Sequence, residues 1–136
     1  MKVKDLMSTN VISIPPKKTV EKALKTLREN NIHHLPIIKD DELVGIVTER
    51  DLLQVVGYWV GTEEESERDR DALEMKVKKI MKKDVITCSP EFSIKDAAEL
   101  MLKHKIGSLV VLDDNKKVIG IITVTDMLKA ITKLVN

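Results

Sequence analysis

The sequence predicts an α/β fold in which two strand–helix–strand–strand–helix motifs pack with pseudo-twofold symmetry. Three observations lead to this prediction: the chain repeats itself, each copy changes from strand-like to helical spacing of its apolar residues, and several apolar runs lack alternation. Runs without alternation are typical of strands that are covered on both faces. We expect a first motif at residues 1–58, a helical linker at 59–76 and a second motif at 77–136.

The repeat is visible in three pairs of segments. VKDLM at 3–7 returns as VKKIM at 77–81, NVISI at 10–14 returns as DVITC at 84–88, and GIVTERD at 45–51 returns as GIITVTD at 120–126. Internal repeats of this kind indicate duplicated structural units. Each copy has only about 55 residues, which is a marginal size for an independent domain. We therefore expect the two copies to pack face to face.

The first copy begins with a short strand followed by a helix. Val11–Ile14 is an apolar run, and Pro15 and Pro16 end it because proline cannot donate a ladder hydrogen bond. From Thr19 onward the apolar residues follow a helical spacing, and residues 28–31 close the helix. The apolar positions of this helix are Val20, Ala23, Leu24 and Leu27.

Two further strands complete the pattern in each copy. The strands are expected at Leu35–Ile38, Leu43–Thr48, Leu109–Leu112 and Val118–Thr123. The first two are joined by a polar turn at residues 39–42. The central helix of the second copy has Ser93 as its expected N-cap, with Asp96 at the third helical position.

The linker is dominated by charged residues. Residues 62–75 are predicted to form a charged helix, because Thr62 and Glu65 fit a capping box and glutamates fill the first turn. The alternative is a surface for a partner protein, anchored by Trp59.

The composition excludes several classes of protein. With 23 basic and 22 acidic residues and only three aromatic rings, the chain lacks the charge and the stacking platform of a nucleic-acid binder. It has no apolar run long enough to span a bilayer and no secretion signal, so we expect a cytoplasmic protein. The single cysteine, Cys88, excludes an internal disulfide framework and is expected to be a buried apolar residue.

The Thr-x-x-Asp pattern at Thr48–Asp51 and Thr123–Asp126 has two interpretations. It matches a capping box, in which the threonine hydroxyl accepts from a backbone N–H and the acid accepts from another. Aspartate is shorter than the usual Glu or Gln and reaches back less easily, which favours a ligand-binding role. A helix N-terminus attracts phosphate, and the two oxygens of an aspartate suit the diol of a ribose.

These features together resemble a stand-alone protein made of a tandem pair of cystathionine-β-synthase (CBS) domains, a Bateman module. The resemblance covers Val3 to about Val135. It is carried by the VKDLM and VKKIM lead-ins, the NVISI and DVITC strands, the IHHLPII and IGSLVVL strands, and the two Thr-x-x-Asp turns.

The resemblance implies a module that binds an adenosyl ligand (AMP, ADP, ATP or S-adenosylmethionine) in the cleft between the copies. It places ribose against Asp51 and Asp126, with Thr48 and Thr123 assisting at ribose or phosphate. It places phosphate near His33 and His34, and adenine near Ile12 and Ile86. The matching residues of the second copy are Gly107 and Ser108, with Val110 in place of Pro36, so the resemblance does not imply an equally tight second phosphate site.

The residues themselves add to this picture. His33 and His34 must point to opposite sides of an extended chain, so at most one faces the ligand directly. A histidine becomes a better phosphate partner when protonated, near an unperturbed pKa of roughly 6.5. Arg50 is a further candidate phosphate contact, and Thr125 is its weaker equivalent in the second copy. His104 is isolated, so no metal site is expected.

We therefore expect a regulatory sensor with no required cofactor, acting as a homodimer on a separate effector protein. An enzyme is the first rival, but the sequence has no nucleophile elbow, phosphate-binding glycine loop or metal-ligand spacing. A second rival is a ligand-free dimerisation or interaction module whose Thr-x-x-Asp turns serve only as caps.

Overall fold

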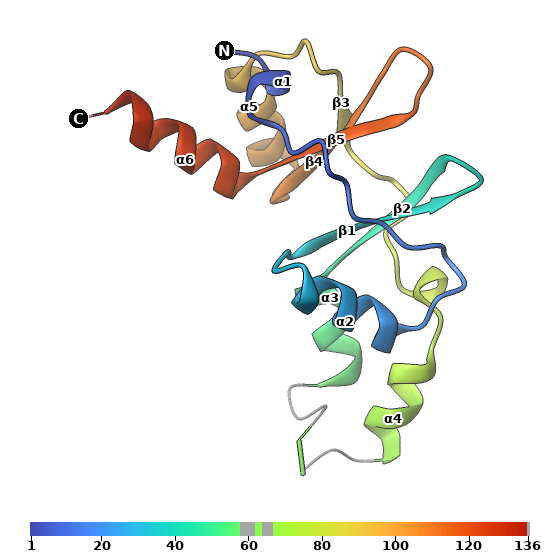
Figure 1. The fold of residues 1–136 in the computed structure, drawn as a ribbon. Helices are drawn as coiled ribbons and strands as arrows, with labels where there is room; N and C mark the ends of the chain where they lie inside the picture. The colour runs from blue at the N-terminus through green and yellow to red at the C-terminus, as the bar shows by residue number, and fades with distance from the viewer. Residues whose placement is uncertain (58–61, 64–66, 136) are drawn as a thin grey trace. The chain divides into compact units, whose positions relative to one another are not determined.

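The computed structural model describes residues 1–57, 62–63 and 67–135 and divides the chain into two compact units. One unit is Ile12–Val85, and the other combines Met1–Val11 with Ile86–Asn136 (Figure 1). We call them unit A and unit B. No helix within the described ranges is both long and apolar enough to cross a membrane.

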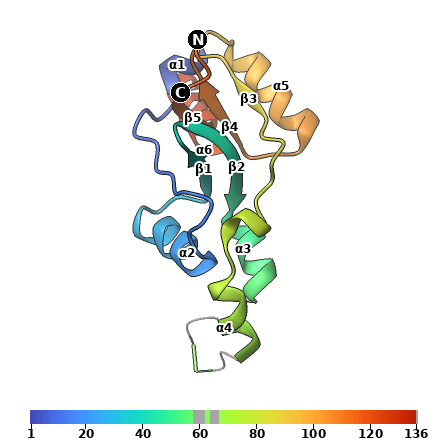
Figure 2. The ribbon, with the colours of Figure 1, turned by 90° about the vertical axis from the view of Figure 1, so that its right-hand side faces the viewer.

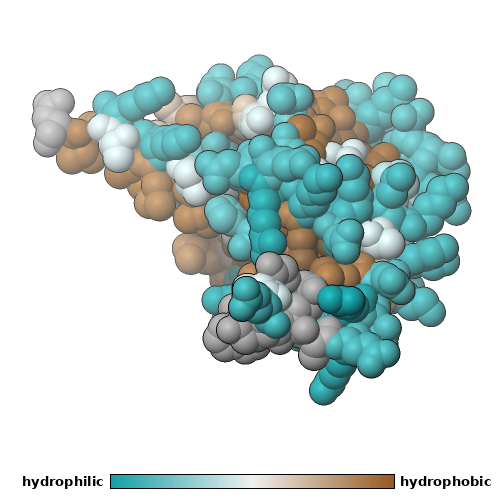
Figure 3. Space-filling view, turned by 60° about the horizontal axis from the view of Figure 1, so that its bottom comes forward, coloured by the Kyte–Doolittle hydropathy of each residue, from teal (hydrophilic) through white to brown (hydrophobic). Residues whose placement is uncertain are grey.

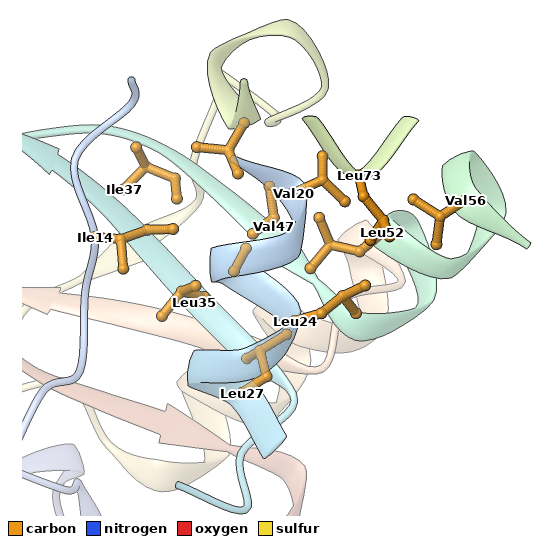
Figure 4. Close-up of a cluster of buried hydrophobic side chains, with 12 residues drawn as sticks. Ile14, Val20, Leu24, Leu27, Leu35, Ile37, Val47, Leu52, Val56 and Leu73 are labelled. Atoms are coloured by element: carbon orange, nitrogen blue, oxygen red, sulfur yellow. The ribbon is translucent and has the colours of Figure 1, made fainter. Parts of the chain in front are cut away.

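Unit A is a β-hairpin with helices packed against it. In chain order its elements are α2 (Val20–Glu29), β1 (His34–Lys39), β2 (Glu42–Thr48), α3 (Glu49–Val56), α4 (Glu67–Glu74) and the 3₁₀ turn η1 (Val77–Lys79). The antiparallel β1 and β2 are joined through Asp40 and Asp41, which both have positive φ, as the tightest hairpin turns require. Figure 4 shows the core of this unit, where Leu27, Leu35 and Leu52 are fully buried.

Unit B has a three-stranded sheet. Its elements are α1 (Val3–Leu6), β3 (Thr87–Cys88), α5 (Ile94–His104), β4 (Ser108–Leu112), β5 (Val118–Thr123) and α6 (Val124–Leu134). The strand order is β3-β4-β5, with β3 parallel and β5 antiparallel to β4. Its core is formed by Val3, Cys88, Ala97, Met101, Leu109, Val111 and Ile122.

The predicted α/β class with two repeated motifs is confirmed, and so is the predicted N-cap at Ser93; the structure adds a second N-cap at Thr19. Thr19 Oγ1 accepts a hydrogen bond from the Lys22 amide at 3.1 Å, and Ser93 Oγ accepts one from the Asp96 amide at 3.0 Å. The four predicted hairpin strands are present, three of them one residue or more longer than expected.

The first strand of each copy is shorter than predicted. In unit A it is reduced to one parallel bridge, between Ile14 and Ile37. Ile14 donates to the Pro36 carbonyl, but Pro15 has no N–H with which to continue the ladder. In unit B the corresponding strand has two residues, Thr87 and Cys88.

The linker contains a helix that is shorter than predicted, α4. Figure 2 shows α4 beside α3, and it contacts α2 as well. Leu73 of α4 belongs to the core of unit A. The proposed cap between Thr62 and Glu65 and the proposed anchor Trp59 involve positions outside the described residues.

The lead-in segments pack on the other copy's motif. Ser8, after the VKDLM lead-in, bridges to Ile121 of β5, and Lys82, after VKKIM, bridges to Ile46 of β2. The compact units therefore differ from the repeat boundaries expected from the sequence, because each unit includes the lead-in of the opposite copy. Val3 and Val77 of the two lead-ins are completely buried in the units they join.

Candidate functional site

The first Thr-x-x-Asp turn is a complete capping box at the start of α3. Thr48 Oγ1 accepts from the Asp51 amide at 3.1 Å, and Asp51 Oδ2 accepts from the Thr48 amide at 3.3 Å. Thr48 has extended backbone angles, as expected for an N-cap. Both residues remain partly exposed.

The second turn repeats this arrangement at the start of α6. Thr123 Oγ1 accepts from the Asp126 amide at 3.3 Å, and Asp126 Oδ2 accepts from the Thr123 amide at 2.9 Å and from its hydroxyl at 3.1 Å. The capping interpretation is therefore confirmed for both turns. Both aspartates reach back to the N-cap amide, so their shorter side chain does not speak against a cap.

The caps use only one oxygen of each carboxylate. Within the described ranges, Oδ1 of Asp51 and Oδ1 of Asp126 take part in no hydrogen bond. Each aspartate is partly exposed, so its second oxygen can accept from a ligand hydroxyl while the first holds the helix start. Capping and ligand binding are therefore compatible at both turns.

The hairpin register brings the two histidines to the first turn. His34 of β1 pairs with Thr48 of β2, and the Glu49 amide donates to the His33 carbonyl at 3.0 Å. The helix start is thus tied to the strand start by backbone bonds. Sequence spacing alone shows no such link, because residues 33–34 and 48–51 are separated by the whole hairpin.

The two histidines face different surroundings, as strand alternation requires. The His33 side chain is 70% exposed, with Nδ1 3.6 Å from Glu49 Oε2. His34 is half-buried, and its pKa is lowered from 6.5 by burial and by charge on His33, while Asp51 raises it. His34 is therefore the histidine that lies within electrostatic reach of Asp51. Arg50, in the first turn of α3, is exposed.

Glu49 is a further candidate site residue, which the sequence analysis did not single out. Its carboxylate is the only acidic group within ion-pair distance of His33 among the described residues. Its position directly after Thr48, at the helix start that the strand places beside the histidines, could have drawn attention to it.

The equivalent positions of unit B carry little charge. Ser108 is buried and pairs with Thr123, and the Val124 amide donates to the Gly107 carbonyl at 3.1 Å. The frame is therefore the same, but Gly107 and Ser108 replace the histidines and Val124 and Thr125 replace Glu49 and Arg50.

Ile12 and Ile86, the candidate adenine contacts, lie in different units. Ile12 packs against the core of unit A and Ile86 against that of unit B, and both are only partly buried. The structure brings Ile12, His33, His34, Thr48, Arg50 and Asp51 into one unit, and Ile86, Ser108, Thr123 and Asp126 into the other.

Other chemically active side chains lie elsewhere. Cys88 is buried, and burial raises the pKa of its thiol to about 11, which keeps it protonated. His104, at the end of α5, is exposed. No group of three or more potential metal ligands occurs in the part of the chain that the structure describes.

The comparison with known families accounts for both copies. The family model of the CBS domain matches residues 3–58 and 77–133, so the chain belongs to the CBS domain family. It is 35% identical over 135 residues to the CBS domain-containing protein DDB_G0289609 of Dictyostelium discoideum, covering 98% of this chain and 93% of that protein. It is also 35% identical to protein MJ1232 of Methanocaldococcus jannaschii over 97% of this chain, but it spans only 40% of that protein's length.

Solved structures of CBS domain pairs have the same fold. The CBS domain pair of protein MJ0100, in complex with 5′-methylthioadenosine and S-adenosyl-L-methionine, matches with a TM-score of 0.83 and 27% identity, covering 99% of this chain and 98% of that one. CBSX2 in complex with AMP matches with a TM-score of 0.80 and 29% identity, covering 98% and 97%. Related CBS pairs therefore bind adenosyl ligands.

Proposed function

We propose that this chain is a regulatory module that binds an adenosyl nucleotide at its Thr-x-x-Asp turns and signals to a partner protein. The observation that carries the proposal is the free second oxygen of Asp51 and of Asp126. Each oxygen is held at a fixed place because its twin is bonded to the helix start. A preorganised acceptor of this kind suits a ribose hydroxyl.

The surroundings of Asp51 suit the remainder of a nucleotide. His34 and Arg50 supply groups that bind phosphate, whereas His33 lies beside Glu49. Ile12 supplies partly exposed apolar surface for adenine in unit A, and Ile86 supplies such surface in unit B. AMP, ADP and ATP share these elements.

S-Adenosylmethionine is the alternative ligand, and the complex of MJ0100 supports it.

We assign the chain no catalysis and no required cofactor, since the residues of both turns are committed to capping and to ligand contacts. Regulation requires that the ligand bind two arrangements of the protein with different affinity, and the difference is the free energy available for signalling.

A homodimer is part of the proposal, and α6 supports it. Figure 3 shows hydrophobic side chains along α6 at the molecular surface. Leu128 and Ile131 are 57% and 53% exposed, whereas Val56, at the place of Ile131 in the first copy, is 1% exposed in a core that includes Leu73 of α4. In unit B α6 contacts α1, α5 and β5, whereas in unit A α3 is also covered by α4. We propose that a second copy of this chain covers this face.

The complete capping boxes also favour a second candidate function. If the turns serve only as caps, the chain is a ligand-free interaction module, and Thr48 and Asp51 contribute to stability alone.

Thermal unfolding with AMP, ADP, ATP and S-adenosylmethionine separates the two candidates. A ligand present at a hundred times its dissociation constant adds about 2.7 kcal/mol to the free energy of unfolding. Asp51→Asn and Asp126→Asn keep a capping oxygen but alter the ribose acceptor. We expect one ligand to raise the midpoint of the wild type and these variants to reduce the shift.

Asp5→Ala is the matched control, because Asp5 Oδ2 accepts a backbone bond from the Lys2 amide at 2.8 Å in the same capping manner at α1. It should lower stability without changing the ligand shift. No shift with any of the four ligands supports the interaction module instead.

A further inference from the structure

The two Thr-x-x-Asp sites have the same backbone frame but different charge. We propose that they select ligands by the charge of the 5′ group: the site of unit A binds a phosphorylated adenosyl ligand and takes up a proton on His34, whereas the site of unit B binds an adenosyl ligand with an uncharged 5′ group. This inference rests on the proposed function and assigns a ligand class to each site.

The frames are closely comparable because the same bonds build them. His34 pairs with Thr48 as Ser108 pairs with Thr123. The first amide of each helix donates to the carbonyl of the residue before the strand pair, at 3.0 Å in unit A and 3.1 Å in unit B. A ribose held by the aspartate would therefore direct its 5′ group toward equivalent positions in both sites.

The side chains at those positions differ in charge. In unit A the 5′ group would meet His34 and Arg50, and His33 lies beside Glu49. In unit B it would meet Gly107, Ser108, Val124 and Thr125, leaving Asp126 as the one ionised group of the turn. A phosphate dianion beside an aspartate without a cationic partner is repelled, and at low local dielectric this repulsion is strong.

An apolar contact takes the place of the charges in unit B. Val124 is 44% exposed where unit A has Glu49. A methylthio group can pack on this apolar side chain. A phosphate in the same place would lose hydrating water without gaining a hydrogen bond in return. The second site thus favours a small uncharged substituent.

The proton uptake in unit A follows from the groups that face the histidines. The charged neighbours of His34 are His33, which directly precedes β1, and Asp51 on α3; the charged neighbour of His33 is Glu49. Burial of His34 and repulsion from His33 favour the neutral form of His34 when no ligand is bound. A phosphate dianion reverses this balance, because the imidazolium is stabilised by an adjacent negative charge. Binding therefore takes up a proton near neutral pH.

The experiment is calorimetric titration with AMP and with 5′-methylthioadenosine. It is run at about pH 7.5, where the phosphate of AMP is a dianion, its second pKa being roughly 6. Two buffers of different ionisation enthalpy give the number of protons taken up. Asp126→Asn weakens the site in unit B and Asp51→Asn weakens the site in unit A, so each site is measured in turn.

In Asp126→Asn we expect AMP to bind at least tenfold more tightly than 5′-methylthioadenosine, with measurable proton uptake. In Asp51→Asn we expect the reverse preference and no proton uptake. The double variant His33→Gly/His34→Ser gives unit A the residues of unit B at these positions, and it should lose both the preference for AMP and the proton uptake.

Three results would overturn the inference: equal affinity of AMP for both sites, binding of AMP to unit A without proton uptake, or an unchanged preference in the double variant. The proton count of the wild type needs no variant, so a misfolded variant does not prevent the test. If neither compound binds at all, it is the proposed function that fails.

Discussion

Met81 lies directly over Gly45. A Cβ on Gly45 would sit 2.5 Å from Met81 Sδ and 3.1 Å from the Lys82 carbonyl oxygen, and Met7 stands in the same relation to Gly120, at 2.6 Å. Because glycine has no side chain, the lead-in of the opposite copy can pack closely against each GIVT or GIIT strand at this position. This close approach explains why Gly precedes each Thr-x-x-Asp turn by two apolar residues.

Gly45→Val is expected to lower the free energy of unfolding by about 1–3 kcal/mol, because overpacking at this contact forces the lead-in away from β2. Combining it with Met81→Ala should recover part of the loss, since the shorter side chain makes room for the valine. Urea unfolding of the two single variants and the double variant gives the coupling. Strictly additive losses would show that Met81 is not the obstacle.

Asp51→Ala is expected to lower the free energy of unfolding by about 1 kcal/mol without ligand, because the Thr48 amide loses its acceptor. Asp51→Asn should lose less, since its carboxamide oxygen can replace Oδ2. Urea unfolding measures both variants. An equal loss in the two variants would mean that the negative charge at the start of α3, rather than the hydrogen bond, supplies the stability.

The pH dependence of stability is expected to report His34. Its folded pKa is lowered, so below about pH 6.5 the unfolded chain binds the proton more readily than the folded one. This residue's contribution therefore makes the free energy of unfolding fall as pH decreases through that window, and it is constant above it. His34→Gln should flatten the slope there when unfolding is followed from about pH 8 to pH 5. An unchanged slope would assign the effect to other groups.

Ile131→Glu is expected to convert the proposed homodimer to a monomer, because it places a charge on the apolar face of α6. Lys133→Glu is the control: it changes the charge of the helix by two units rather than one, but at an exposed position on the other side of that helix. Light scattering after size exclusion measures the mass of each variant. A wild type that is monomeric at high concentration would contradict the dimer.

Much of the candidate site could be predicted from the sequence, because caps and hairpins depend on neighbouring residues. Ser93 caps α5, and Thr48 and Thr123 cap the starts of α3 and α6, as the spacing indicates. The first strand failed as a prediction because an apolar run does not show how many ladder bonds a partner strand will supply. In unit A only Ile14 forms ladder hydrogen bonds with β1 before Pro15 ends the run.

The sequence by itself determined the duplication, the α/β class and the two Thr-x-x-Asp turns, since periodicity and capping act over a few residues. The tertiary structure decided that each lead-in packs on the opposite copy, that α4 covers unit A, and that His34 rather than His33 lies in reach of Asp51. These outcomes depend on hairpin register and on packing between distant segments. The alternation of an extended chain determines only that the side chains of His33 and His34 point to opposite sides. Which of them points inward depends on which face of β1 is buried.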